Sequence, residues 1–428
     1  MSRRVVVPVV ALLALVACST TAPARADVPA PRVLVMDGAT LAAARADVVA
    51  GSAAIAPAIA ELRAAADAAL GSAPVTVTDK TLLPPSGDPH DYVSLSIYWW
   101  PDAAKPGGTP YLQRDGQVNP EASDLTKYDG ARIVKLVGGV ETLALAGYLT
   151  GERAYSDAAA RGIRAWFIDE RTRMNPSMRF AQIIPGRTEE RGTGIIESRQ
   201  LLRVVDAARL LDGTPSWSAA DGSALRAWFG QFADWLTGSA QGQMEGRATN
   251  NHGTWYDAQL VGAALFAGRT KLATDTLTAA AARRIVPQLE PDGRQPKEAA
   301  RTRSFHYSTF NMLAFALLGD LGRDAGVDVW HGPGAERIRA GIDFLVAHRA
   351  GAAPWPYADI EVPDYFLELA PILARASRAY PDAGYDRVLA ELGATQKPLA
   401  ILKLRLGVFG SLGGAALADP VRLVARSG

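Results

Sequence analysis

Cysteine and histidine are scarce in this chain of 428 residues. Cys18 is the only cysteine, so the mature protein has no internal disulfide and no cysteine nucleophile. Three of the five histidines, His90, His331 and His348, lie far apart in the sequence and lack the spacing of metal ligands. We therefore expect neither a metal site nor another cofactor.

An excess of either charge is also missing. The chain has 45 lysines and arginines and 44 acidic residues, which gives a formal net charge of +1. Removal of residues 1–26 would take away three arginines and no acidic residue, and the charge would become −2. Such a protein has no overall field that attracts nucleic acid or an anionic membrane, so we expect no nucleic-acid partner. Binding of a polyanion would need a local cluster of arginines.

The N-terminus has the pattern of a signal peptide, predicted over residues 1–26. Two arginines precede an apolar run at 5–17, which is too short for an ordinary membrane span, and small residues follow it. Two cleavage sites fit. Residues 15–18 resemble a lipobox, which would leave Cys18 lipid-modified as a membrane anchor, whereas residues 24–26 resemble an ordinary signal peptidase site. We expect an exported protein, either secreted or held as a cell-surface or periplasmic lipoprotein.

The remainder, residues 27–428, has an alanine-rich helical texture without a Ser/Gly/Pro linker, which indicates one domain. Apolar spacing predicts helices near residues 42–70, 133–150, 153–168, 195–212, 219–237, 254–267, 270–288, 307–321, 334–349 and 363–379. Helix pairs with short turns on one side and long polar loops on the other are typical of an α/α toroid or a solenoid. Because no repeat of fixed length is visible, we predict an all-α fold, an incomplete α/α toroid with loops lining a groove, and a monomer.

A long segment at about residues 82–129 interrupts the helical pattern. It is rich in proline and glycine, and loops of this length are usually functional or disordered. Its aromatic residues favour an ordered loop. Trp99 and Trp100 precede Pro101-Asp102 there, so one of them could stack on a sugar ring, with packing in the core as the alternative.

Three polar segments differ from the rest of the chain, at residues 172–192, 245–257 and 295–307. Each precedes an apolar helix, where backbone N–H groups point outward and favour anions. Together they supply the groups that β-elimination of a uronate polymer requires. Asparagine, histidine and arginine can neutralise the sugar carboxylate, and a tyrosine near a cation that lowers its pKa can act as base and acid. We assign these roles to Asn251, His252, Arg301 and Tyr307.

A single tyrosine in both roles has a stereochemical consequence. The C5 proton and the O4 leaving group must then depart from the same face of the sugar. Glucuronate and mannuronate units have this relation, whereas guluronate units do not. We therefore expect little or no cleavage of polyguluronate.

From about Tyr92 to Tyr357 the sequence resembles the alginate-lyase-like domain family. The motifs that carry this resemblance are Asp91-Tyr92, Tyr98-Trp99-Trp100-Pro101-Asp102, Asn119-Pro120-Glu121, Thr172-Arg173-Met174-Asn175-Pro176, Asn250-Asn251-His252-Gly253-Thr254-Trp255 and Ala300-Arg301-Thr302-Arg303-Ser304. The resemblance implies an α/α toroid and lyase chemistry, with the catalytic roles on the same asparagine, histidine, arginine and tyrosine.

Two branches of this family differ in the interval from an arginine to the catalytic tyrosine. In polysaccharide lyase family 5 the interval is seven, and from Arg303 it leads to Phe310, which has no hydroxyl. In family 38, the glucuronan lyase branch, it is six, and from Arg301 it leads to Tyr307. The chain is thus more similar to family 38, which implies glucuronan and polymannuronate as substrates.

Further substrate-binding residues are predicted in the same polar segments and in the aromatic loop. They are Trp99, Trp100, Arg187, Asn250 and Arg303. For each candidate a structural role is the alternative: His252 as a helix cap or core residue, Tyr307 as a packing residue, and the arginines as solvated surface charges.

Two other functions stay open from the sequence alone. A glycoside hydrolase of the same fold class would need two carboxylates, and the sequence offers Glu197, Glu245, Asp257 and Glu298. A carbohydrate-binding lipoprotein without catalysis is the second alternative.

Overall fold

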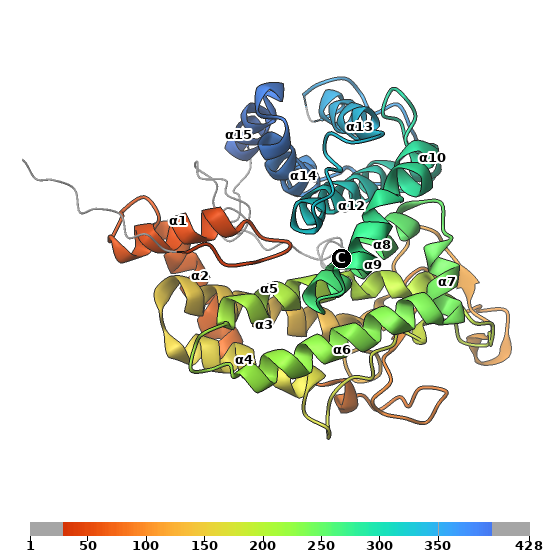
Figure 1. Cartoon of the computed structure of the whole chain (residues 1–428). Helices are drawn as coiled ribbons and strands as arrows, with labels where there is room; N and C mark the ends of the chain where they lie inside the picture. The colour runs from red at the N-terminus through yellow and green to blue at the C-terminus, as the bar shows by residue number, and fades with distance from the viewer. Residues whose placement is uncertain (1–28, 350, 396–428) are drawn as a thin grey trace, which may run out of the picture.

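Helices account for most of the computed structural model, which describes residues 29–349 and 351–395 (Figure 1). The predicted signal peptide with Cys18 and the residues 396–428 lie outside the described residues. The helices are α1 (Gly38–Val49), α2 (Ala56–Leu70), α3 (Gly130–Thr150), α4 (Arg153–Phe167), α5 (Leu201–Leu211), α6 (Ala219–Gly238), α7 (Ala240–Gly246), α8 (Asn251–Phe266), α9 (Thr270–Thr278), α10 (Val286–Gln288), α11 (Pro296–Ala299), α12 (Ser304–Ala325), α13 (Ala335–Ala347), α14 (Tyr365–Ala379) and α15 (Tyr385–Thr395).

The helices form two rows. Helices α3, α5, α8, α12 and α14 contact one another in this order, and α4, α6, α9, α13 and α15 pack against them. Nearly every residue of α8 and most residues of α12 are buried, whereas α6, α9 and α13 are buried on one side only. This inner and outer arrangement is an incomplete α/α toroid, as the sequence predicts.

Close packing within the inner row depends on small residues. A Cβ atom on Gly262 of α8 would lie 2.3 Å from the side chain of Leu202 of α5, so a larger residue would force the Leu202 side chain to shift. Helix α3 is the one described helix that is long and apolar enough to span a membrane. Most of it is buried against α2, α4 and α5, which is the environment of a core helix.

Two predicted helices are interrupted in the structure. The segment predicted at 195–212 begins as a 3₁₀ helix, Thr193–Gln200, before α5. The segment predicted at 270–288 consists of α9, a π-helical turn at Ala281–Ile285, and α10. The π turn contains the buried Arg284, whose guanidinium bonds to the buried carboxylate of Asp257 at 2.7 and 2.8 Å. The spacing of apolar residues does not predict this ion pair, because it joins residues that are far apart in the sequence.

The aromatic loop is ordered, as its composition predicts, and short strands fix its course. The strands are β1 (Val93–Leu95), β2 (Trp99–Trp100), β3 (Leu112–Gln113) and β4 (Phe180–Ile183). β2 pairs with β3 in antiparallel orientation, and β1 pairs with β4 in parallel orientation. The second pair joins the aromatic loop to the polar segment that begins at residue 172.

The N-terminal segment at 34–36 is fastened across the inner row by one buried carboxylate. Asp206 of α5 accepts hydrogen bonds from the backbone N–H groups of Leu34, Val35 and Met36, at 2.6, 2.9 and 2.7 Å. Arg375 of α14 donates to the carbonyl of Val35 at 2.6 Å. The segment therefore links α5 to α14, two helices that are far apart in the row.

We expect Asp206→Asn to lower the free energy of unfolding by about 2 kcal/mol, because the amide nitrogen would face a buried N–H group that loses its acceptor. Denaturant titration measures this change. Asp212→Asn is the matched control, since Asp212 follows the same helix and is exposed, and it should change the free energy by no more than about 0.5 kcal/mol. Equal stability of both variants would contradict the fastening role.

Candidate active site

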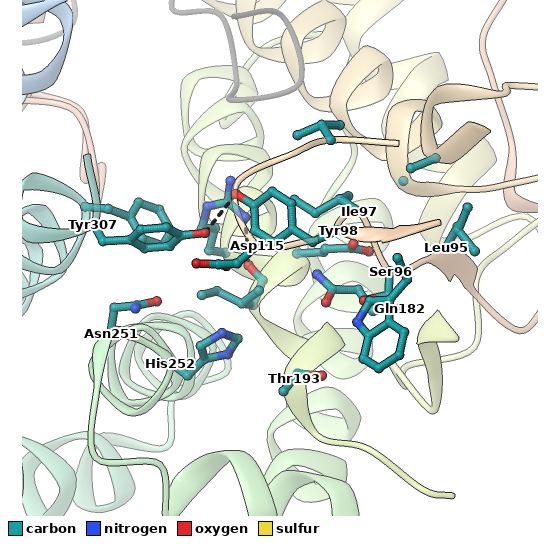
Figure 2. Close-up of a pocket in the computed structure, with 18 of the residues that line it drawn as sticks. Leu95, Ser96, Ile97, Tyr98, Asp115, Gln182, Thr193, Asn251, His252 and Tyr307 are labelled. Atoms are coloured by element: carbon teal, nitrogen blue, oxygen red, sulfur yellow. Dashed lines mark hydrogen bonds between the residues drawn. The ribbon is translucent and has the colours of Figure 1, made fainter. Parts of the chain in front are cut away.

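A pocket of about 470 Å³ lies where the aromatic loop, the segment at 182–200 and the N-terminal ends of α8 and α12 meet. All four catalytic candidates, Asn251, His252, Arg301 and Tyr307, line it. Figure 2 shows Tyr307 and Tyr98 approaching each other from two sides, with Asn251 and His252 at the end of one helix. Residues that are distant in sequence therefore meet at one pocket.

Tyr307 has two close polar neighbours. Its hydroxyl donates a hydrogen bond to the hydroxyl of Tyr98 at 2.8 Å, the dashed line in Figure 2. The guanidinium of Arg301 lies over its ring, 3.7 Å from the centroid. Arg301 is in turn bound by Asp115 through contacts of 2.5 and 3.2 Å. Arg301 therefore faces the tyrosine ring while its N–H groups are held by a carboxylate.

The predicted lowering of the Tyr307 pKa is wrong. Burial, followed by the neighbouring Tyr98, raises the pKa of Tyr307 well above its usual value of 10, and the opposing effect of Arg301 is smaller. Desolvation penalises the phenolate more than one cation stabilises it. At neutral pH, Tyr307 is therefore a phenol that can serve as an acid.

Asn251 is held by a buried glutamate. Glu298 of α11 accepts the backbone N–H of Asn251 at 2.6 Å and its side-chain Nδ2 at 2.7 Å. Because a carboxylate accepts hydrogen bonds, this contact fixes which end of the amide faces Glu298. The Oδ1 atom is buried and has no hydrogen-bond partner among the described residues. One N–H of the amide is left for a ligand.

Two imidazoles in the pocket are oriented by glutamates in the same way. The Nδ1 atom of His252 lies 2.6 Å from Glu245, and that of His306 lies 2.6 Å from Glu368. Although burial raises the pKa of Glu368, His306 and Thr309 hold it below its usual value. A carboxylate partner places the ring proton on Nδ1, so that Nε2 is the atom available to a ligand.

The predicted substrate-binding residues divide into two groups. Trp99 and Arg303 line the pocket, and Arg303 is bound by Glu361 at 2.6 Å. Trp100, Arg187 and Asn250 are not among the residues that line it. Trp100 donates to the carbonyl of Gln117 at 2.9 Å, Arg187 lies over the ring of Trp99, and Asn250 precedes the first residue of α8.

Sequence reasoning missed the residues that hold the catalytic candidates in place. Tyr98 and Asp115 come from the aromatic loop, and Glu245 and Glu298 come from two other polar segments. Their positions in polar or aromatic segments were a signal, but their partners were not visible, since each contact joins different parts of the chain. Within 29–349 and 351–395, no group of three or more His, Cys, Asp or Glu side chains is arranged for a metal ion.

Comparison with known families identifies the domain. A model of the alginate lyase family matches residues 76–355, which is more than half of the chain. The chain belongs to the alginate lyase family. It is therefore a polysaccharide lyase, and the hydrolase alternative is not supported.

Solved structures of alginate lyases have the same fold. One from Bacteroides ovatus is 34% identical, with a TM-score of 0.82, and the match covers 88% of this chain and 99% of that one. Alginate lyase A1-III from Sphingomonas species A1 is 17% identical, with a TM-score of 0.51 and coverage of 82% and 94%. A histidine-to-alanine variant of A1-III complexed with a tetrasaccharide is 16% identical, with a TM-score of 0.52 and coverage of 83% and 96%. No curated protein sequence matches significantly.

The carboxylates considered for a hydrolase have other partners in this lyase. Asp257 pairs with Arg284, Glu245 contacts His252, and Glu298 contacts Asn251. Glu197 lines the pocket and accepts hydrogen bonds from the hydroxyls of Tyr92 and Ser94 at 2.7 and 2.6 Å. These four carboxylates therefore hold other groups in place.

We expect Glu298→Gln to lower kcat/KM about 10- to 100-fold, because a glutamine oxygen can replace only one of two charge-assisted acceptors and Asn251 loses its fixed orientation. Steady-state kinetics would measure the loss, with the melting temperature as a check on folding. Glu290→Gln, at an exposed position shortly before α11, is the control and should retain full activity. Unchanged activity of Glu298→Gln would contradict the role of Glu298 in positioning Asn251.

Proposed function

We propose that this lyase cleaves 1,4-linked polymers of uronic acid, with glucuronan and polymannuronate as substrates, by syn β-elimination. The observation that carries the proposal is the meeting of Tyr307, Asn251, His252 and Arg301 at one pocket. The six-residue interval from Arg301 to Tyr307 supports the glucuronan lyase branch, family 38. A solved alginate lyase that is 34% identical supports a uronate polymer as the substrate class.

Neutralisation of the sugar carboxylate is the first requirement of this reaction. Asn251 offers the N–H that Glu298 does not use, and His252 offers Nε2, which donates to the carboxylate when the imidazole carries a proton on both nitrogens. Hydrogen bonds to the carboxylate stabilise the enolate-like intermediate that forms when the C5 proton leaves. Because Arg301 is bound by Asp115, we assign it to Tyr307 and not to the carboxylate.

Tyr307 would transfer one proton from C5 to O4. The C5–H bond breaks towards the phenolate oxygen, and its electrons form the C4=C5 double bond as the C4–O4 bond breaks. Tyr307 then gives the proton to O4, and the phenolate is regenerated. Arg301 over the ring and a hydrogen bond from Tyr98 would stabilise this phenolate, against the cost of burial.

Export belongs to the proposal as well. The polymer is too large to enter a cell easily, and the segment at 1–26 has the order of a signal peptide. We propose secretion or attachment as a lipoprotein through Cys18, with the protein acting as a monomer.

A substrate panel tests the stereochemistry. Glucuronan and polymannuronate should give products with the ultraviolet absorbance of the C4=C5 double bond, and polyguluronate should give little or none. Cleavage of polyguluronate would overturn the single-base mechanism, and would point to His252 as a base on another side of the pocket. Absence of absorbance with every polyuronate, hyaluronan included, would favour the carbohydrate-binding alternative.

The pH dependence tests the role of Tyr307. If its phenolate is the base, kcat/KM should rise with pH through the neutral and alkaline range, about tenfold per unit below the raised pKa of Tyr307. Arg301→Gln removes the cation that opposes the raised pKa of Tyr307. The rise of kcat/KM with pH should therefore move to higher pH, and the activity at a given pH should fall.

Tyr307→Phe should abolish activity at every pH, and its melting temperature shows whether the fold is kept. A rate that instead falls as pH rises through the alkaline range would show that Tyr307 acts only as an acid. The base would then be another group in the pocket.

A further inference from the structure

A second group of polar side chains lies away from Tyr307 in the same pocket. Figure 2 shows Gln182 on the side of the pocket away from Tyr307 and Asn251, and in this view Thr193 lies between His252 and Gln182. Trp99, Arg191 and Thr193 line this part of the pocket. The guanidiniums of Arg187 and Arg191 lie 4.6 and 5.6 Å from the centre of the Trp99 ring. Two guanidinium groups therefore already contact the ring of Trp99, and less of the ring is available to stack on a sugar.

Unpartnered polar atoms occur at both ends of the pocket. Among the described residues, Asn251 Oδ1 and Arg303 Nε are buried without a hydrogen-bond partner near Tyr307. Arg191 Nη1 and Thr193 Oγ1 are buried without one at the other end. Buried polar groups in native proteins are nearly always paired, so each pair of atoms indicates a place where a polar ligand group completes the site.

The charges around Arg191 specify the kind of ligand. Arg187 pairs with Glu189 at 3.2 Å, whereas no carboxylate of the described residues lies within ion-pair distance of Arg191. Burial lowers the pKa of Arg191, the charge of Glu189 opposes this effect, and the nearby charge of Arg187 adds to it. Two cations lie beside one indole and only Arg187 is paired with a carboxylate, so this part of the pocket favours binding of an anion.

We propose that Arg191 and Thr193, with Trp99 as a platform, form a second carboxylate subsite that binds the uronate unit next to the one being cleaved. This inference rests on the proposed function. A 1,4-linked uronate chain carries a carboxylate on every sugar, so a chain with one carboxylate at Asn251 and His252 presents another at a fixed spacing. The enzyme would thereby require consecutive uronate units, although its net charge is close to zero.

The kinetic test compares Arg191→Gln with Arg179→Gln. Arg179 is exposed, lies in the same segment and is not among the pocket residues, so its variant is the matched control. On glucuronan, Arg191→Gln should raise KM about tenfold, the loss of one charge-assisted hydrogen bond. On partly carboxyl-reduced glucuronan, whose neighbouring units are often neutral, the ratio of KM between variant and wild type should shrink. An equal ratio on both polymers, or an unchanged KM on glucuronan, would overturn the subsite.

A binding test separates this subsite from the catalytic proposal. Titration calorimetry of tetraglucuronate with Tyr307→Phe measures binding without turnover. Adding Arg191→Gln should weaken binding about tenfold, and adding Arg191→Lys should weaken it less, because lysine keeps the charge and loses the planar fork. This result would support the subsite even if the wild type never formed an unsaturated product, which would overturn only the proposed reaction. Unchanged or absent binding of tetraglucuronate would overturn the subsite itself.

Discussion

Buried and half-buried carboxylates fix the polar groups of the pocket. Glu298 holds Asn251, Glu245 holds His252, and Asp115 holds Arg301. A carboxylate that leaves water needs donors for its oxygens, and each of these finds them in a side chain that lines the pocket. The free-energy cost of burying the carboxylate is therefore offset only while its partner side chain keeps this orientation. Loss of either partner leaves the other unpaired, which is why conservative substitutions are expected to be informative.

The toroid supplies these pairs because its inner helices begin at the pocket. Asn251 and His252 lie in the first turn of α8, and Tyr307 lies in the first turn of α12. Backbone N–H groups at these helix starts favour an anionic ligand. The buried inner row holds the N-terminal ends of α8 and α12 in place. The segments at 93–123 and 182–200 form the opposite wall of the pocket. Asp206 and Arg375 fasten the N-terminal segment across the same row.

The electrostatics of the pocket reconcile an almost neutral protein with a polyanionic substrate. Its arginines are Arg301 and Arg303 near Tyr307, Arg191 near Trp99, and Arg199 over the ring of Phe310. Burial raises the pKa of Tyr307 well above its usual value, in spite of Arg301. A bound uronate chain would bring negative charge to positions where cations and unpartnered polar atoms already lie. Substrate binding and the proton chemistry of Tyr307 are therefore coupled in the proposed mechanism.

The sequence by itself determined the helical class, the approximate helix positions and the lyase family. Apolar spacing indicates which face of a helix is buried, and the motifs around Asn251 and Arg301 indicate the lyase family. Both signals can be read from the sequence because they depend on residues that are close together along the chain. The tertiary structure decided the partners and the protonation state. The pairing of Asn251 with Glu298 joins separate segments, and the raised pKa of Tyr307 follows from its burial beside Tyr98. Such pairings and desolvation depend on distances across the fold, which no local pattern of residues contains.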